Sequence, residues 1–245
     1  YESLRTSIDE VFPDFAADIR IPVLLRFGSW VGGDMDGNPN VSATTIRSTL
    51  RRHRAQILAL YTRELKEIGH VLSQSPYRIP ISDAVTERID AYTELFPDVR
   101  EQIPPRHRLM PYRVLTPLIA ARLGATGADA EGGYDNAGEF IADLETIADS
   151  LIENRGRHAG LFPVQRLIWR ARTFGFHLAT LDVRQDSLVH RQAVGRGLGV
   201  PDWLELDPAT RTAAITEALA DGRPPAAGLE RQDPVVESGP RGLAL

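Results

Sequence analysis

Two short stretches of this 245-residue chain concentrate the side chains that could do chemistry. The first, FGSWVGGDMDGNP, runs from Phe27 to Pro39 and places Asp34, Asp36 and Asn38 at alternate positions among glycines. Alternating oxygen-bearing side chains are typical of a calcium loop. Glycines that lead into a helix are typical of a phosphate-binding loop. The loop therefore raises two ligand hypotheses, which its spacing can test.

The spacing favours neither ligand. An EF-hand loop beginning at Asp34 would need glycine at its sixth position and glutamate at its twelfth, where the chain has Pro39 and Thr45. Neither the GK[ST] ending of a Walker loop nor the GxGxxG dinucleotide fingerprint is present. A tight turn stays open as an interpretation, with the polar side chains bonding local amides. A turn alone leaves unexplained why so many special residues fall together: Trp30, Gly32, Gly33, Asp34, Asp36, Gly37, Asn38 and Pro39.

The second stretch, FGFHLATLDVRQDS, follows some 150 residues later. Residues 176–183 read as a buried strand, and Asp186 or Ser187 is a good helix N-cap. Arg184 and Gln185 would then lie at a strand end, where α/β proteins hold ligands. A guanidinium suits bidentate binding of phosphate or carboxylate. The alternative for Arg184 is a buried ion pair with a neighbouring aspartate.

The elements that position these stretches are mostly helices. Residues 23–27, VLLRF, predict a short strand before the first loop. Ser42 is a candidate N-cap for a helix of up to thirty or so residues that continues to Leu72, because apolar residues recur near helical spacing. Further helical patterns occur at 3–11, 82–96, 111–123 with Gly124 as a stop, from 139 to an end near Gly156 or Gly160, at 163–174, after Ser187 and at 203–222. The glycine-rich residues 124–138 predict a mobile connection, and residues 223–245 a linker or disordered tail.

Composition excludes several classes of protein. A formal charge of −5 argues against a nucleic-acid partner, and the absence of cysteine excludes disulfides and a cysteine nucleophile. No apolar run is long enough for a membrane span and no signal-peptide pattern is present. We therefore expect a cytoplasmic protein with no membrane partner. Lys66 is the only lysine. The chain does not begin with methionine, so we expect a segment of a longer protein.

Taken together, FGSWVGGDMDGNPNV and FGFHLATLDVRQDS resemble the phosphoenolpyruvate carboxylase family, whose motifs are FxSWxGGDRDGNPxV and LDxRQxS. The resemblance spans nearly the whole chain. It implies a mainly α-helical fold that is part of a helix-rich α/β barrel of the TIM type, with a few short strands. Residues 1–222 would form a central segment of that barrel.

The resemblance also implies an activity. Such an enzyme joins bicarbonate to phosphoenolpyruvate with Mg²⁺ or Mn²⁺, gives oxaloacetate and phosphate, and works as a cytoplasmic homotetramer. The catalytic histidine and the metal carboxylates of the family lie outside this segment, so no catalytic or metal-binding residue is expected within it. Trp30 to Asn38 would form an active-site loop, and Arg184, Gln185 and Arg26 are the candidate substrate contacts.

One residue departs from the family pattern. Met35 stands where the family has an arginine that reaches the substrate phosphate, and a thioether cannot replace a guanidinium for a dianion. Either a neighbouring arginine such as Arg26 or Arg184 supplies the charge, or the substrate binds differently, or the site is weakened. The alternative function is a non-catalytic helical binding or assembly module derived from the same fold.

Overall fold

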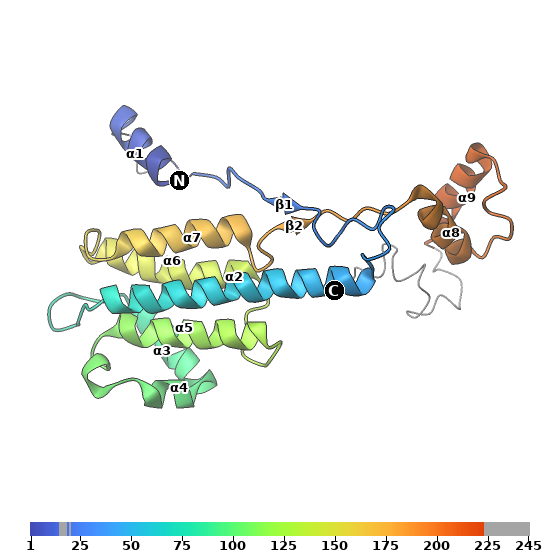
Figure 1. Ribbon diagram of the computed structural model, residues 1–245. Coiled ribbons are helices and arrows are strands. Elements are labelled where there is room, and N and C mark those ends of the chain that lie inside the picture. Colours follow the sequence, from blue (N-terminus) through green and yellow to red (C-terminus); the bar gives the residue numbers. More distant parts are fainter. Residues whose placement is uncertain (15–18, 20, 223–245) are drawn as a thin grey trace. The chain divides into compact units, whose positions relative to one another are not determined.

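The structure is a computed structural model that describes residues 1–14, 19 and 21–222 (Figure 1). It is mainly helical, with two short strands. The elements are α1 (Glu2–Val11), β1 (Gly28–Ser29), α2 (Ala43–Val71), α3 (Asp83–Leu95), α4 (Pro97–Gln102), the 3₁₀ helix η1 (Pro105–His107), α5 (Pro111–Gly127), α6 (Ala137–Glu153), α7 (Leu161–Phe174), β2 (Thr180–Leu181), α8 (Ser187–Leu198) and α9 (Pro208–Ala220). The tail expected at 223–245 lies outside the described residues. Within the described ranges no helix is both long and apolar enough to cross a membrane.

The chain divides into two units. Unit 1 consists of Tyr1–Phe27 and Arg52–Thr180. Unit 2 consists of Gly28–Arg51 and Leu181–Leu245, of which residues up to 222 are described. Helix α2 contributes its first turns to unit 2 and the rest to unit 1.

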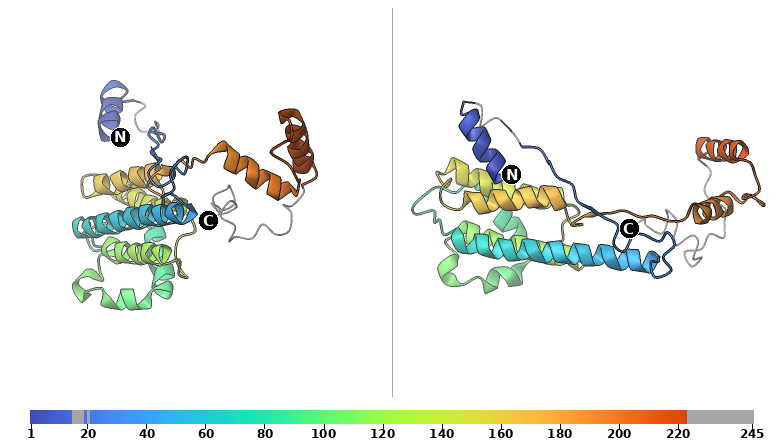
Figure 2. Two further views of the ribbon diagram at one scale, coloured as in Figure 1. Left: turned by 45° about the vertical axis from the view of Figure 1, so that its right-hand side comes forward. Right: turned by 45° about the horizontal axis from the view of Figure 1, so that its top comes forward.

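Unit 1 is a helical bundle whose core follows the predicted apolar spacing. Helices α5, α6, α7 and the later part of α2 lie side by side in Figures 1 and 2. The apolar positions expected on the long helix, on α3 and on α6 are buried, with the exceptions of Leu50, Leu95 and Ile152. Helices pack in this way because each buries one apolar stripe against its neighbours. The buried residues with this origin include Ile57, Tyr61, Leu65, Ile68, Leu72, Val85, Ile89, Tyr92, Phe140, Leu144, Ile147 and Leu151.

One buried carboxylate ties three helices of the bundle together. The side chain of Asp143 in α6 is only 1% exposed, and its Oδ2 accepts hydrogen bonds from the hydroxyls of Tyr92 at 2.7 Å and Tyr134 at 2.5 Å. Arg122 of α5 lies 3.8 Å from the same carboxylate and stacks on the Tyr134 ring at 3.9 Å. Burial, and then the neighbouring Asp143, raises the pKa of Tyr134. This cluster anchors the connection at 124–138, which the sequence predicted to be mobile, through a buried tyrosine.

Neither predicted strand has the predicted bounds. Residues 23–27 form no strand and most of their side chains are exposed, while β1 covers only the following Gly28–Ser29. Within 176–183 only Thr180 and Leu181 form a strand, and Thr180 is exposed. The amide of Leu178, which has a φ of 63°, donates to the carbonyl of Phe174, so the first residues of the predicted strand close the end of α7. Strand propensity records residue types, but a strand also needs a partner backbone.

The helices differ from the prediction in two further ways. Helix α5 does not stop at Gly124 but continues to Gly127. A glycine ends a helix when it takes a left-handed conformation, and Gly124 is not among the residues with positive φ. The short helices α4 and η1 were not predicted, although each has a proline in its first turn, which is a recognised helix start.

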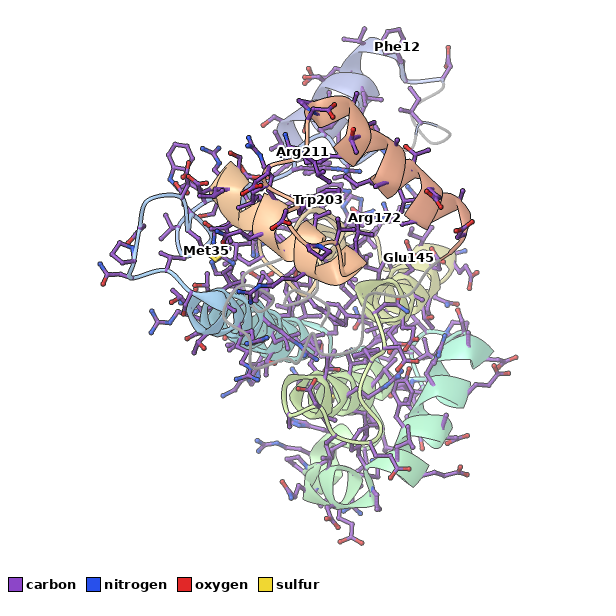
Figure 3. All side chains as sticks on the ribbon, turned by 90° about the vertical axis from the view of Figure 1, so that its right-hand side faces the viewer. Phe12, Met35, Glu145, Arg172, Trp203 and Arg211 are labelled. Atoms are coloured by element: carbon purple, nitrogen blue, oxygen red, sulfur yellow. The ribbon has the colours of Figure 1, made fainter. Side chains whose placement is uncertain are left out.

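Unit 2 contains the helices α8 and α9. Asp186, one of the two predicted alternatives, is the N-cap of α8. Asp207 caps α9 by accepting hydrogen bonds from the amides of Ala209 and Thr210. Trp203, labelled in Figure 3, is 5% exposed and packs on Gly195. A Cβ at Gly195 would lie 2.6 Å from this side chain, so the close contact requires glycine.

Candidate functional site

The two motif stretches meet through backbone pairing in unit 2. Beyond β1 and β2, the Arg184 amide donates to the Gly33 carbonyl at 3.0 Å, and the Met35 amide donates to the Arg184 carbonyl at 2.8 Å. These bonds make a parallel bridge between Asp34 and Arg184. Strands β1 and β2 are neighbours in one two-stranded sheet (Figure 1). The structure thus brings together two segments that lie some 150 residues apart in the sequence, with both ending at the same edge.

The glycines of the loop allow this close approach. A Cβ at Gly33 would lie 2.5 Å from the carbonyl oxygen of Asp182, on the opposite strand. Gly32 has a φ of 83° and a Cβ there would collide with Thr49. Gly37 has a φ of 65°, with open space around its missing side chain. Gly32 and Gly33 are therefore required by packing, and Gly32 and Gly37 by their backbone conformation, in agreement with the turn interpretation.

The polar side chains of the loop bond to the loop itself. The Oδ1 of Asp34 accepts from the Asp36 amide at 3.3 Å, and the Oδ1 of Asn38 accepts from the Asn40 amide at 3.0 Å. Both are Asx turns, in which the side chain bonds the amide two residues on. The carboxylate of Asp36 is exposed. Asp34 and Asn38 therefore hold the loop in shape, which leaves Asp36 as its exposed charge.

Arg184 is the cation that faces this loop. Its guanidinium lies 5.0 Å from the centre of the Trp30 ring and 3.2 Å from the Oδ2 of Asp182. The predicted alternative of an ion pair with Asp182 is therefore present, but the pair is not buried, since the Arg184 side chain is 49% exposed. An exposed pair contributes about 0–1 kcal/mol, so an incoming anion can compete with Asp182 for the guanidinium. The stacking on Trp30 was not predicted.

Met35 points into unit 2 instead of out of the loop. It is only 6% exposed, and the Nε2 of Gln185 donates to its sulfur at 3.8 Å (Figure 3 labels Met35). The Oε1 of Gln185 accepts from the Asp186 amide at 2.8 Å. Both polar groups of Gln185 are thus used within the fold. The alternation of side chains along an extended segment could have predicted that Asp34 and Met35 point to opposite sides.

Arg26, the remaining candidate contact, is exposed and belongs to unit 1. Throughout the part of the chain that the structure describes, no three histidine or carboxylate side chains are grouped closely enough to hold a metal ion.

The pairing and the loop define a class of protein. A helical chain in which two parallel strands end in a glycine-rich loop and an exposed arginine has the layout in which α/β proteins hold ligands at strand ends. The family model described as phosphoenolpyruvate carboxylase matches residues 1–236. The chain belongs to this family.

Curated relatives agree with this assignment. The chain is similar to a phosphoenolpyruvate carboxylase of Xanthomonas euvesicatoria pv. vesicatoria, with 49% identity over 92% of this chain and 24% of the relative. It is 36% identical to one of Rhodopseudomonas palustris over 85% of this chain and 23% of the relative. The match to one of Roseiflexus castenholzii is 29% identical over 91% of this chain and 26% of the relative. The chain thus spans about a quarter of the length of the curated relatives it matches.

Proposed function

We propose that this chain serves as a segment of a phosphoenolpyruvate carboxylase and supplies one anion-binding edge of its active site. The whole enzyme would carboxylate phosphoenolpyruvate with bicarbonate and release oxaloacetate and phosphate. In this proposal Arg184 binds an anionic group of the substrate, while the loop from Trp30 to Asn38 holds the guanidinium in place. Gln185 acts through Met35 and the loop, without touching the substrate.

The observation that carries this proposal is the parallel pairing of Asp34 with Arg184. It brings an exposed guanidinium to the edge where both strands end, beside backbone that only glycine permits. A guanidinium in this position offers two parallel N–H donors, which suits a phosphate or a carboxylate. The alternative, a non-catalytic module, gives no reason for an exposed arginine to stack on an exposed tryptophan at this edge.

Other parts of the proposal rest on the family alone. We infer that β1 and β2 belong to a larger barrel of the TIM type, whose further strands would come from outside this chain. Among the described residues, the two strands form a single ladder and each has one edge without a strand partner, which supports this inference. Mg²⁺ or Mn²⁺ would be held by carboxylates outside the chain. The assembly would be a cytoplasmic homotetramer.

A segment exchange tests the proposal. In the Xanthomonas euvesicatoria relative, the matching quarter is replaced by this chain, and oxaloacetate formation is followed by coupled reduction to malate. We expect the chimera to be active. Arg184→Met should raise the KM for phosphoenolpyruvate about tenfold to a hundredfold, since a hydrogen bond to a charged group contributes about 1.5–3 kcal/mol.

The control is Arg172→Met, which removes a surface arginine paired with Glu145 in unit 1 and labelled in Figure 3. It should leave KM unchanged. A folded chimera that makes no oxaloacetate, or an Arg184→Met variant with unchanged kinetics, would contradict the proposal. The 245-residue chain by itself should make no oxaloacetate, because the family's catalytic histidine and metal carboxylates are not in it.

A further inference from the structure

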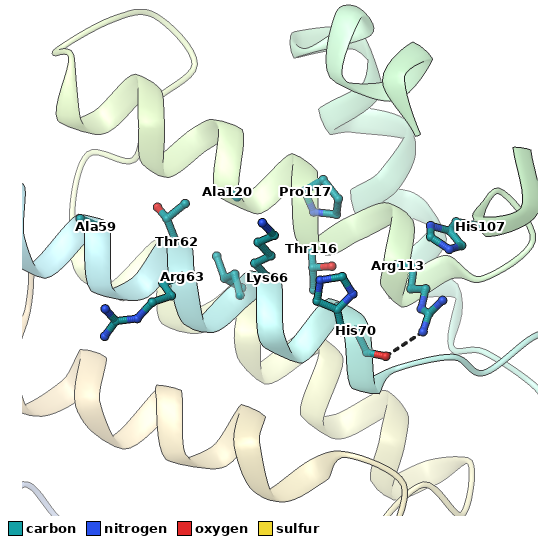
Figure 4. Close-up of a pocket in the computed structure, with 12 residues that line it drawn as sticks. Ala59, Thr62, Arg63, Lys66, His70, His107, Arg113, Thr116, Pro117 and Ala120 are labelled. Atoms are coloured by element: carbon teal, nitrogen blue, oxygen red, sulfur yellow. Dashed lines mark hydrogen bonds between the residues drawn. The ribbon is translucent and has the colours of Figure 1, made fainter. Parts of the chain in front are cut away.

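A groove in unit 1 collects basic side chains that the candidate site does not use. It has a volume of about 640 Å³ and lies between α2 and α5, with His107 of η1 at one end (Figure 4). Sites for small molecules have volumes of about 300–1,000 Å³. The groove therefore has the size for a small ligand and not for a folded partner.

The basic groups come from three elements. Arg63, Lys66 and His70 project from α2, Arg113 from α5 and His107 from η1. None of the residues that line the groove is acidic, although the whole chain carries a formal charge of −5. Burial, together with the nearby Arg113, Arg106 and His70, lowers the pKa of His107. Arg63, Lys66 and Arg113 carry the positive charge of the groove, in a chain that is acidic as a whole.

Lys66 occupies the middle of this row. Figure 4 shows its side chain extending toward α5, near Pro117 and Ala120. Its exposed ammonium has no hydrogen-bond or ion-pair partner in the described ranges 1–14, 19 and 21–222. An ammonium is a compact point charge that commonly binds phosphate. As the only lysine of the chain, Lys66 can be changed without ambiguity about which amine responds.

The groove is formed by a close helix contact and an apolar floor. A Cβ at Gly69 would lie 2.6 Å from the hydroxyl of Thr116, so α2 and α5 approach closely at this point. Pro117 and Ala120 of α5 provide apolar surface beside Lys66. Arg113 is held in place because its Nη2 donates to the His70 carbonyl at 2.7 Å. One wall is therefore basic and preorganised, and the floor is apolar.

We propose that this groove binds a small phosphorylated molecule, with its dianionic phosphate at Lys66 and an apolar body on the floor beside Pro117 and Ala120. Three cationic side chains, Arg63, Lys66 and Arg113, with no acidic residue among those that line the groove, favour a dianion over a monoanion, because each added negative charge interacts with all three. The proposal concerns unit 1 only. It does not rest on the carboxylase function or on Arg184, which belongs to unit 2.

Binding to the 245-residue chain tests the proposal, with three probes measured by isothermal titration calorimetry. Phenyl phosphate carries both parts of the proposed ligand, inorganic phosphate carries only the head, and phenol carries only the body. We expect phenyl phosphate to bind more tightly than inorganic phosphate and phenol not to bind. Equal binding of phenol and phenyl phosphate, or no binding of either phosphate by the folded chain, would overturn the proposal.

Variants locate the binding. Lys66→Met keeps the length of the side chain but removes the charge, and should weaken phenyl phosphate about tenfold or more. Lys66→Arg should retain most of the affinity, because the charge remains. Arg184→Met should not change it, and this separates the groove from the candidate active site. Circular dichroism checks that each variant is folded. If a folded Lys66→Met chain binds phenyl phosphate as the parent does, the groove is not the site.

Discussion

Gly33→Ala should separate the two motif segments. The added Cβ would lie 2.5 Å from the Asp182 carbonyl oxygen, whereas ordinary contact begins at 3.4 Å, so the backbones must move apart by about 0.9 Å. Bonds of 3.0 Å from the Arg184 amide and 2.8 Å from the Met35 amide cross this gap. A displacement of that size breaks both of them. Since each contributes about 1 kcal/mol, the local stability should fall by about 2 kcal/mol, or about thirtyfold in the opening equilibrium.

Amide hydrogen exchange followed by NMR measures this effect directly. In the Gly33→Ala chain the amides of Met35 and Arg184 should exchange about thirtyfold faster, while the helices of unit 1 keep their protection. Gly37→Ala is the matched control. Its cost is the positive φ of 65°, and no atom lies within 4 Å of its Cβ, so the two amides should keep their protection. Unchanged exchange in Gly33→Ala, or the same loss in both variants, would refute the reasoning.

Two further predictions concern buried side chains. Asp143→Ala leaves two tyrosine hydroxyls without their acceptor and Arg122 without its buried carboxylate partner, and should lower the free energy of unfolding by about 3–5 kcal/mol in urea denaturation. Asp149→Ala in the same helix should cause no loss. Burial, and then Glu145 and Glu153, raise the pKa of this carboxyl in the folded chain, so its negative charge destabilises the folded state above that pKa. Equal losses in the two variants would contradict the assigned role of the cluster. In the active chimera, Met35→Arg should not improve the KM for phosphoenolpyruvate, since position 35 is buried; a tenfold decrease in KM would instead mean that an arginine there still reaches the substrate.

The helices of this chain could be predicted because their signals are local. The apolar positions from Ile57 to Leu72 recur at helical spacing, and α2 ends within one residue of the predicted limit. Asp186 caps α8 through its own side chain, whose Oδ1 accepts from the Leu188 amide. Such signals depend on residues within one or two turns, so no distant contact is needed to interpret them.

The strands could not be bounded in the same way. Residues 23–27 have strand-forming side chains, yet the backbone that pairs begins only at their end, where the Phe27 carbonyl accepts from the Thr180 amide at 2.8 Å. The partner lies more than 150 positions away in the sequence. Nothing local to either segment says which residues will face each other.

For the candidate site too, some features follow from the sequence and others only from the tertiary structure. From the sequence alone came the family resemblance, the two motifs, the absence of cysteine and the departure at Met35, because these are properties of residue types and their order. Only the tertiary structure decided that Arg184 stacks on Trp30, that Gln185 turns inward to the Met35 sulfur, and that Gly33 packs against Asp182. The groove around Lys66 has the same origin, since it exists only where α2 meets α5. Side-chain types are written in the chain, but the contacts they make depend on backbones that folding brings together from distant positions.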